Sequence, residues 1–581
     1  MQNPNHPQFQ FDITIHKDFL KQSIIQLFET LPGNKQLILS QRVLHLLKLS
    51  IENKLLLENG VKKTLQIETI NQIENDITQI FIIIPPKQDL IKKISKMIKT
   101  ANGPNNIYQL VFWPQRNLIA KELLEQEGVL SSVKVMDFSF DLIPLDQDVL
   151  SLEMPDAFRD IVVEQDLSIY THVADSINRI QLLMGNIPNI YCKGDGAKMV
   201  YDIIKVESLE LEQDQDSQEV ESLIIYDRSI DLITPMLTQL VYEGLVDEQF
   251  GINGNLVSVQ KKIFGKEGQE GEQYQTIQMN LDKDPLIYNV RGLQVASLAK
   301  YLSEQARQQE VEKVEFQKQL QIQIKANSGQ EAARIKAEQD SNLRHLNISG
   351  KIADNIRTIS FYKMLSLEQG IINGDKSDKA LDYIEAMIQS EIDLNKVVRL
   401  LTLRTLVDGG LKQKPYDYMR REIVHVYGFK TIAFLNNLLK AGMVYKSDPK
   451  QLFFKLQESF KLLNLNVRSD ETDPKDPAYT YGGHYPLMAR LTEKIFDKES
   501  WKPFKAQMQL INGFQLEPDR PVRLNVPGKK PIVIVYILGG VTYGEIAALR
   551  LLGKQFNKEI IVCTTNITNG TKLISSLRER I

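Results

Sequence analysis

The length, composition and charge of the chain exclude several classes of protein. Its 581 residues suffice for roughly three or four domains, and hydrophobic and charged fractions of 43% and 25% are those of a folded globular protein, not a disordered or fibrous one. A formal net charge of −3 gives no field that would attract nucleic acid. Only two cysteines are present, Cys192 and Cys563, which argues against a disulfide framework or a cysteine zinc site.

The N-terminal residues favour a cytoplasmic protein. Residues 1–16 are mostly polar where a signal peptide would need an apolar core. The most apolar stretch, residues 531–552, contains a glycine pair, Glu545 and Arg550, which a lipid-facing helix would not carry there. We therefore expect the chain to associate with membranes only through partner proteins.

The first part of the chain alternates strand and helix patterns. A short buried strand over residues 36–40 precedes a helix over residues 42–56, and the next strand is ended by two prolines. The later elements of this pattern are a strand over 77–84, a helix over 87–100, a strand over 107–114 and a helix over 116–129. This order predicts a parallel α/β domain over residues 1–146.

An acidic stretch interrupts the pattern farther along. Helical patterning dominates residues 148–205, and residues 209–222 then carry Asp, Glu, Ser and Gln without apolar periodicity. We interpret this stretch as a solvated loop, with an acidic interaction tail as the alternative. A strand is expected to begin at Leu223.

The C-terminal residues 529–581 show the order strand, helix, strand, helix, which needs neighbouring strands to bury both faces of a sheet. We expect this piece to complete the sheet that begins near Leu223. The second α/β domain would then be discontinuous, over residues 147–256 and 504–581, with a mainly helical domain over residues 257–503 inserted into it.

The most unusual stretch lies inside this insertion. Residues 300–343 are charged and sparsely apolar, and helix-forming residues dominate on both sides of residues 326–330, ANSGQ. The simplest prediction is a helical hairpin within residues 293–365, with its tip near residues 326–329. Such an arm either stacks on itself as a solvated pair of helices or binds another helix, and periodicity alone leaves both possibilities open.

The residue patterns of common enzymes are not found in the sequence. Its seven histidines have no spacing that would put two metal ligands on one helix face, and no GxSxG elbow occurs. Two glycine-rich turns, at residues 192–198 and 538–545, do not match a phosphate-binding fingerprint, so we expect their glycines to permit close packing. The sequence therefore predicts no catalytic residue, no metal and no cofactor.

The densest cluster of charges follows the strand predicted at Leu223. Asp227, Arg228 and Asp231 come directly after this strand, and further acidic residues follow at 243, 247 and 248. Paired carboxylates can do acid–base work or bind magnesium. Because these lie at a strand end beside an arginine and before a proline turn, we favour a structural network of ion pairs.

The run from Leu223 to Ile252, LIIYDRSIDLITPMLTQLVYEGLVDEQFGI, closely resembles the most characteristic motif of the Sec/Munc (SM) family of membrane-fusion regulators. Segments that resemble the same family in order are residues 142–161, 187–204, 403–429, 481–491 and 536–552. The resemblance thus covers most of the chain. The motif residues, for which it implies a structural role, are Asp227, Arg228, Asp231, Pro235, Tyr242, Glu243, Gly244, Asp247 and Glu248.

The resemblance implies a three-domain arch, with two parallel-sheet α/β domains and a large, mainly helical domain inserted into the second. It also implies that the chain binds SNARE proteins, of the syntaxin-type Qa and R classes, and templates their assembly in vesicle docking and fusion without covalent catalysis. SNARE motifs are disordered alone, so a rigid helical template would lower the barrier to their assembly.

On this interpretation the polar residues of the hairpin face the SNARE and its apolar residues pack the arm. The expected SNARE contacts are Lys325, Gln330, Arg334, Lys336, Arg344 and Lys351, and the expected packing residues are Ile335, Leu343 and Leu346. The alternative is that these charges only keep the arm soluble.

Residues 143–153, 481–491 and 539–550 are most similar to the vacuolar branch of this family, whose members are subunits of the HOPS and CORVET tethering complexes. That branch implies action on the route from endosome to vacuole or lysosome. It also implies a constant partner, another class C vacuolar sorting subunit, docked within residues 430–490. Candidate contacts are the aromatic residues Phe434 and Tyr485, and Phe429 just before this window, and the alternative is that most of them pack in the core.

Three alternatives stay open. A Golgi or plasma-membrane branch of the same family is one. A scaffold subunit without affinity for SNARE proteins is the second, and an enzyme that uses nucleotides at its parallel sheets is the third.

Overall fold

The structure of the protein is a computed structural model. In it the chain divides into two units, which are residues 12–153 (the N-terminal unit) and the rest of the described chain (the large unit). The described residues are 9–73, 76–101, 106–116, 118–208, 219–260, 276–280, 284–322, 328–375, 378–447, 452–468, 473–498, 500–524 and 528–579.

A five-stranded parallel sheet forms the centre of the N-terminal unit, in the order β2-β1-β3-β4-β5. The strands are β1 (Lys35–Leu39), β2 (Val61–Gln66), β3 (Gln79–Ile84), β4 (Ile107–Phe112) and β5 (Val133–Asp137). The helices are α1 (Ile13–Glu29), α2 (Gln41–Ser50), α3 (Asn53–Glu58), α4 (Gln88–Thr100) and α5 (Leu118–Gln126), and a short hairpin of β6 (Ile143–Asp146) and β7 (Val149–Ser151) follows. The apolar runs of β3 and β4 are buried because they occupy the middle of the sheet.

One predicted helix of this unit is interrupted. The pattern over residues 42–56 predicted a single helix, but α2 ends at Ser50 and α3 begins at Asn53. Between them Ile51 has an extended backbone, with φ −142° and ψ 143°, and a buried side chain. Burial of Ile51 therefore takes precedence over the helical periodicity of the segment.

The central sheet of the large unit joins two distant pieces of the chain. Strands β8 (Asn189–Lys193) and β9 (Val220–Asp227) are parallel neighbours of β14 (Ile532–Leu538) and β15 (Glu559–Thr564), in the order β8-β9-β14-β15. Val535 of β14 pairs with Ile224 on one side and with Val562 on the other. The C-terminal piece thus shares one sheet with β9, which begins at Val220, three residues before the predicted start.

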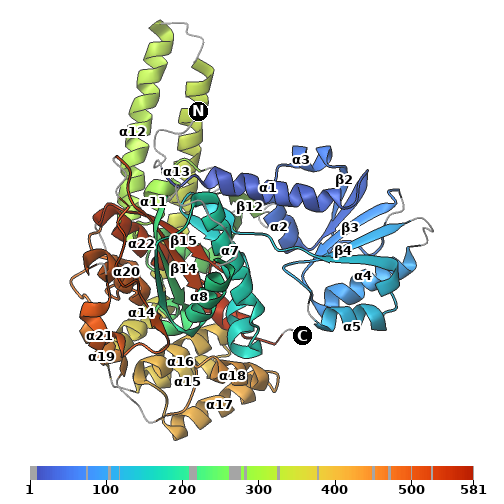
Figure 1. Cartoon of the computed structure of the whole chain (residues 1–581). Helices are drawn as coiled ribbons and strands as arrows, with labels where there is room; N and C mark the ends of the chain where they lie inside the picture. Colours follow the sequence, from blue (N-terminus) through green and yellow to red (C-terminus); the bar gives the residue numbers. More distant parts are fainter. Residues whose placement is uncertain are drawn as a thin grey trace. The chain divides into compact units, whose positions relative to one another are not determined.

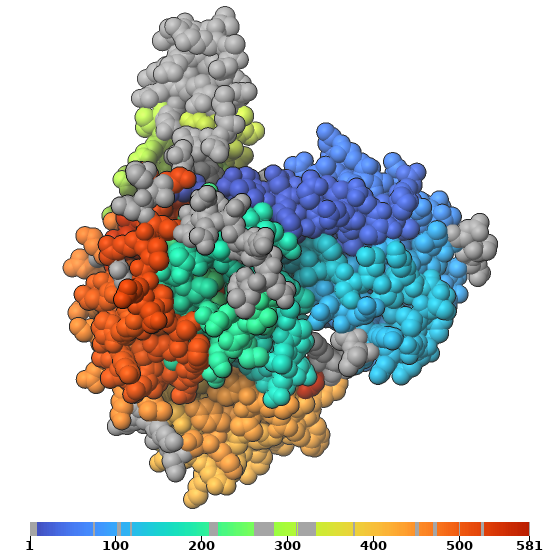
Figure 2. Space-filling model, viewed as in Figure 1, coloured from blue at the N-terminus to red at the C-terminus, as the bar shows by residue number. Residues whose placement is uncertain are grey.

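Helices and a short edge strand surround this sheet. They are α6 (Ala157–Arg159), α7 (Ser168–Met184), α8 (Asp195–Ser208), α22 (Tyr543–Gln555), α23 (Gly570–Ser576) and β13 (Gln515–Leu516), which is antiparallel to β8. Figure 2 shows the segments near residue 200, in teal and green, beside those near residue 500, in orange, on one face of this unit. Most of the acidic stretch predicted as a loop, residues 209–218, lies outside the described residues.

A small antiparallel sheet follows the motif segment, where mainly helix was expected. Its strands are β10 (Ile252–Asn253), β11 (Leu256–Gln260) and β12 (Thr276–Asn280). Alternation of buried and exposed side chains along β11 explains the strand.

The predicted helical hairpin is present as two long helices, α12 (Val295–Ile322) and α13 (Ser328–Ile356). They run side by side and extend away from the rest of the large unit (Figure 1). Residues 323–327, which include part of the predicted tip, lie outside the described residues. We call α12 and α13 together the hairpin.

The remaining helices belong to the helical part of the large unit, and the side chains of one of them, α16 (Leu394–Asp408), are buried on nearly every side. They are α9 (Ile233–Met236), α10 (Tyr242–Phe250), α11 (Ile287–Val290), α14 (Ile359–Ile372), α15 (Lys379–Gln389), α16 (Leu394–Asp408), α17 (Gln413–Tyr427), α18 (Thr431–Lys440), α19 (Leu452–Phe460), α20 (Leu487–Lys498) and α21 (Lys505–Met508). A helix that is apolar all round is expected at the centre of a helical core. The fold class predicted from the sequence, parallel-sheet α/β parts with a large helical part, is confirmed.

Candidate functional site

The motif segment begins where β9 ends, and its first carboxylate caps two turns. Asp227 accepts hydrogen bonds from the backbone N–H of Ser229, at 2.9 Å, and from that of Gly196, at 2.8 Å. The second bond fixes the glycine-rich turn after β8 against the end of β9. Asp227 therefore holds backbone in place and is not free to act as a base.

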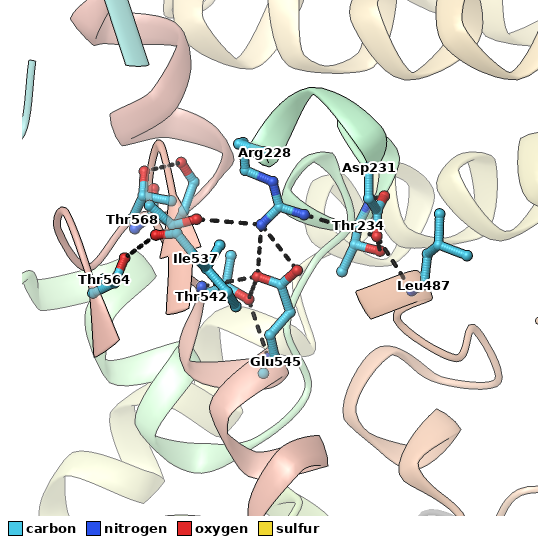
Figure 3. A network of polar contacts seen from close by, with 12 residues as sticks. Arg228, Asp231, Thr234, Leu487, Ile537, Thr542, Glu545, Thr564 and Thr568 are labelled. Carbon is cyan, nitrogen blue, oxygen red and sulfur yellow. Dashed lines mark hydrogen bonds and ion pairs between the residues drawn. The ribbon is translucent and has the colours of Figure 1, made fainter. Parts of the chain in front are cut away.

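Arg228 is fully buried and forms an ion pair with Glu545 at the start of α22 (Figure 3). Its Nη1 lies 2.9 Å from each carboxylate oxygen of Glu545 and donates to the carbonyl of Gly540 at 3.3 Å. Glu545 also completes a capping box with Thr542. Burial raises the pKa of Glu545, and the charge of Arg228 opposes that rise.

Glycine is needed beside this pair, as the sequence predicted. Gly539 has φ +85°, and a Cβ there would come within 2.8 Å of the Arg228 Cβ. A Cβ on Gly544 would lie 2.7 Å from the Tyr481 ring. The turn at residues 538–545 is thus packed closely, with no room for a phosphate group.

Asp231 organises a third set of contacts. Its carboxylate accepts hydrogen bonds from the N–H and hydroxyl of Thr234, at 3.0 and 2.6 Å, and from the N–H of Leu487 at 3.2 Å (Figure 3). His484 lies 3.2 Å from the same hydroxyl, and burial lowers its pKa to about 4 although Asp231 opposes the shift. His484 is consequently neutral near pH 7.

The helix α10 carries three more carboxylates of the motif, and each meets a cation from another helix. Glu243 lies 3.2 Å from Arg550, Asp247 lies 2.6 Å from Lys572, and Glu248 lies 3.3 Å from Arg399. These cations belong to α22, α23 and α16. Paired in this way, the carboxylates bind distant segments together, and the arrangement offers no acid–base pair to a substrate.

The other motif residues pack at the same junction. Pro235 is buried in α9, and Gly244 lies so close to Gln239 that a Cβ would come within 2.7 Å of its side chain. Tyr242 points its hydroxyl at His345 of α13, 2.8 Å away. The motif helix is therefore in direct contact with the hairpin.

The sequence did not identify Glu368 of α14, which is buried beside this network. It accepts from the backbone N–H of Thr238 at 2.8 Å and from its hydroxyl at 3.0 Å. Burial raises the pKa of Glu368 to about 7, against the charge of Arg399 and the Thr238 hydrogen bonds. Its spacing within an apolar helix gives no pattern that would have revealed this role.

The predicted SNARE-contact residues of the hairpin differ in their surroundings. Lys336 and Lys351 are exposed, Arg334 lies 2.7 Å from Glu338 on the same helix, and the half-exposed Arg344 reaches Asp284 at 3.4 Å. Lys325 and the side chain of Gln330 lie outside the described part of the chain. Arg344 thus contributes to the base of the hairpin as well as to its surface.

The predicted packing of the hairpin is corrected at two positions. Ile335 is buried as expected, but Leu343 is 57% exposed and Leu346 is 40% exposed. The reason is helical geometry, because the inward face of α13 is formed by Ser341, His345, Ile348 and Ile352. Leu343 and Leu346 lie three residues apart on the opposite, outward face.

The aromatic residues predicted as partner contacts also divide into two groups. Phe429 is 83% exposed, whereas Phe434 is 3% and Tyr485 1% exposed, which corrects the choice of these two as partner contacts and agrees with the alternative of core packing. Phe434 lies on the inner face of α18, and the Tyr485 ring is covered by the Arg490 guanidinium, 3.5 Å from the ring centre. The outer face of α18 instead exposes Ile432 and Leu439, whose spacing could have been found from helical periodicity.

The described residues show neither a metal-binding cluster nor a membrane-spanning helix. The described residues contain no group of three His, Cys, Asp or Glu side chains placed to hold a metal ion. None of the helices in the described ranges is long and apolar enough to cross a membrane.

Comparisons with known proteins agree with this organisation. The chain is 30% identical to the vacuolar protein-sorting-associated protein 33 homolog of Arabidopsis thaliana, with 97% of each chain covered, and 28% identical to vacuolar protein sorting-associated protein 33A of Rattus norvegicus, with 98% of each covered. Its fold is similar to that in the Unc18–syntaxin 1 complex from Monosiga brevicollis, with a TM-score of 0.59, 14% identity, and 97% of this chain and 99% of that chain covered.

A second structure of the same fold is Sly1p in complex with an N-terminal peptide of Sed5p, with a TM-score of 0.56, 15% identity, and 100% of this chain and 96% of that chain covered. The model of the Sec1 family matches residues 35–576. The chain therefore belongs to the Sec1 family, which confirms the resemblance to Sec/Munc proteins found in its motifs.

Proposed function

We propose that this chain binds SNARE proteins along the hairpin and promotes their assembly in vacuolar protein sorting, as a regulator and not as an enzyme. Membership of the Sec1 family supports this proposal, as do the vacuolar sorting names of its relatives. Proteins of similar fold have been solved in complex with syntaxin 1 and with the Qa SNARE Tlg2. On this proposal the partners are Qa and R SNAREs, and the chain acts at endosome and vacuole membranes to which other proteins recruit it.

The observation that carries the proposal is the outward face of α13. Leu343 and Leu346 are exposed there between the charged residues Lys336 and Lys351. Apolar residues three apart on a helix form the kind of stripe that a second amphipathic helix buries. Such burial would order one SNARE helix on the hairpin, so that its partner meets a structured surface instead of a disordered chain.

The proposal is tested by a double substitution on this face. Replacing Leu343 and Leu346 with Ser should weaken binding of a labelled Qa or R SNARE motif at least about tenfold, because two apolar side chains no longer gain burial on binding. The thermal unfolding midpoint should hardly change, since both side chains are already exposed. Unchanged affinity would contradict the proposal.

We further propose that the chain is a subunit of a class C tethering complex and binds its partner subunit through α18. Phe429, Ile432 and Leu439 expose apolar surface there, and Phe429 is an aromatic side chain that a partner pocket could bury. Ile432→Ser with Leu439→Ser is the matched counterpart of the hairpin variant. This double variant of α18 should lose binding of the partner subunit and keep SNARE binding. The double variant of the hairpin should lose SNARE binding and keep the partner subunit.

A further inference from the structure

A buried carboxylate lies where the hairpin joins the rest of the large unit. Asp284 is 4% exposed and precedes α11. Its Oδ1 accepts from the hydroxyl of Ser341 at 2.5 Å and from the backbone N–H of Leu286 at 3.0 Å, and its Oδ2 lies 3.4 Å from Arg344. One carboxylate thus gathers side chains from a single turn of α13.

His345 connects this carboxylate to the motif helix. Its Nε2 lies 3.1 Å from Asp284 Oδ1, and its Nδ1 lies 2.8 Å from the Tyr242 hydroxyl. Because an ionised carboxylate can only accept, Nε2 carries the hydrogen that points to Asp284. The Tyr242 hydroxyl then donates to Nδ1 of the neutral ring or accepts from it when the ring is protonated, so both forms of His345 keep the contact.

The contacts of Asp284 keep it ionised. Burial alone would raise the pKa of this carboxyl, but the hydrogen bond and charge of His345, with the Ser341 and Leu286 hydrogen bonds, hold its pKa well below the usual range. A paired, buried carboxylate accepts strong, directional hydrogen bonds. It can therefore fix the rotation of α13 about its own axis, which apolar packing alone does not do.

A neighbouring side of α13 is held by its own hairpin partner. Asn342 is buried, and its amide donates to the Leu302 carbonyl at 3.3 Å and to Gln309 at 3.1 Å, both on α12. Ser341 thus binds Asp284, at the base of the hairpin, and the next residue, Asn342, binds α12. The outward direction of Leu343 follows directly from these two anchored neighbours.

We propose that Tyr242, Asp284 and His345 form a latch that sets the orientation of α13 and so presents the outward face at Leu343 and Leu346 to the SNARE. These three are positioning residues, since they contact α13 or belong to its inward face and do not reach its outward surface. The binding role rests on the proposed function, whereas the anchoring of α13 by the latch does not.

The latch is tested in the full chain by Tyr242→Phe, which removes one hydroxyl and keeps the ring that packs edge-on against His345, with centroids 5.6 Å apart. Amide hydrogen exchange in residues 341–352, measured without any SNARE, should become five- to tenfold faster, roughly the effect of one lost buried hydrogen bond. Affinity for the SNARE motif should fall by a similar factor. Asp284→Asn should have the larger effect on both quantities.

A matched control is Tyr226→Phe. The Tyr226 hydroxyl is also buried and lies 3.0 Å from that of Thr492, away from the hairpin. This control should lower the unfolding midpoint comparably yet leave α13 exchange and SNARE affinity unchanged. Unchanged α13 exchange in both Tyr242→Phe and Asp284→Asn would overturn the latch, and faster exchange with unchanged affinity would overturn its role in binding. An intact chain that binds no SNARE motif would overturn the proposed function, and the exchange result would still decide whether the latch anchors α13.

Discussion

The motif segment around α10 and the outward face of the hairpin use charge in opposite ways. In the motif, Arg228, Asp231 and Asp247 are buried and meet partners that come from much later in the chain. On the hairpin, Lys336 and Lys351 are exposed, and the apolar Leu343 is exposed with them. The charge-dense motif is thus the scaffold, and the surface available for binding lies on the less distinctive helix.

This difference follows from the cost of burying charge. An ion removed from water must be paired and hydrogen-bonded, so a buried network tolerates few substitutions and leaves a recognisable pattern of residues. An exposed helix face can exchange one charged residue for another at little cost in stability. The distinctiveness of a motif therefore indicates burial here, and function has to be sought on the surfaces that the motif supports.

The largest effect on stability is expected from Arg228→Met. This change leaves Glu545 buried without its cation and should lower the free energy of unfolding by about 3–5 kcal/mol. Thermal or denaturant unfolding of the purified chain measures it. Adding Glu545→Met should recover part of the loss, because the unpaired carboxylate is then gone. A single variant as stable as the parent would show that the pair is not a structural element.

Next in size is the contrast between two phenylalanines of the helical part. Phe434→Ala should cost about 3 kcal/mol of stability, since it opens a cavity under α18, whereas Phe429→Ala should cost well under about 1 kcal/mol. Unfolding midpoints of the two variants, measured side by side, test this contrast. Equal losses would mean that Phe429 is part of the core and cannot be a partner contact.

A smaller, pH-dependent effect is expected at Glu368. Its pKa is raised to about 7 in the folded state, from an ordinary value of 4.5, so the folded chain takes up a proton that the unfolded chain does not. Lowering the pH from 8 to 5.5 should therefore stabilise the parent relative to Glu368→Gln by about 2 kcal/mol. His484, with a lowered pKa, acts in the opposite direction and is common to both chains. If the free energy of unfolding changed equally with pH in the two chains, the raised pKa of Glu368 would be refuted.

The smallest effect on stability is expected on the hairpin. Arg334→Met breaks the pair with Glu338 four residues on, and should change the free energy of unfolding by no more than about 0.5 kcal/mol. Arg334 lies seven residues before Ser341, on the inward side of α13, so binding at the outward face should be unchanged, and a loss of SNARE affinity would support the contact that the sequence predicts. A fluorescence titration with a labelled SNARE motif separates this role from that of a charge that only keeps the arm soluble. Arg344→Met is a poorer test, because Arg344 also contacts the latch.

Periodicity and turn residues were enough to predict the alternating strands and helices of the first α/β part, the shared sheet of the two chain pieces and the hairpin. They failed at Ile51 and at Leu343, where the fold decides which face of a local pattern is buried. Windows of sequence do not contain that information. The latch could not have been predicted either, since Tyr242, Asp284 and His345 are brought together only by the packing of α10 and α13.

Direct SNARE binding by the hairpin is the central claim, and one replacement tests it. Residues 303–340 are exchanged for a short Gly-Ser linker, and Leu343 and Leu346 are replaced with Ser in the same chain. This removes the proposed contact surface and keeps Ser341, Arg344 and His345 with Asp284. Affinity for Qa and R SNARE motifs is measured against the intact chain. We predict that the intact chain binds and that the replacement lowers affinity more than about tenfold while the unfolding midpoint is retained. Equal affinity after the replacement, or no binding by the intact folded chain, would contradict the account.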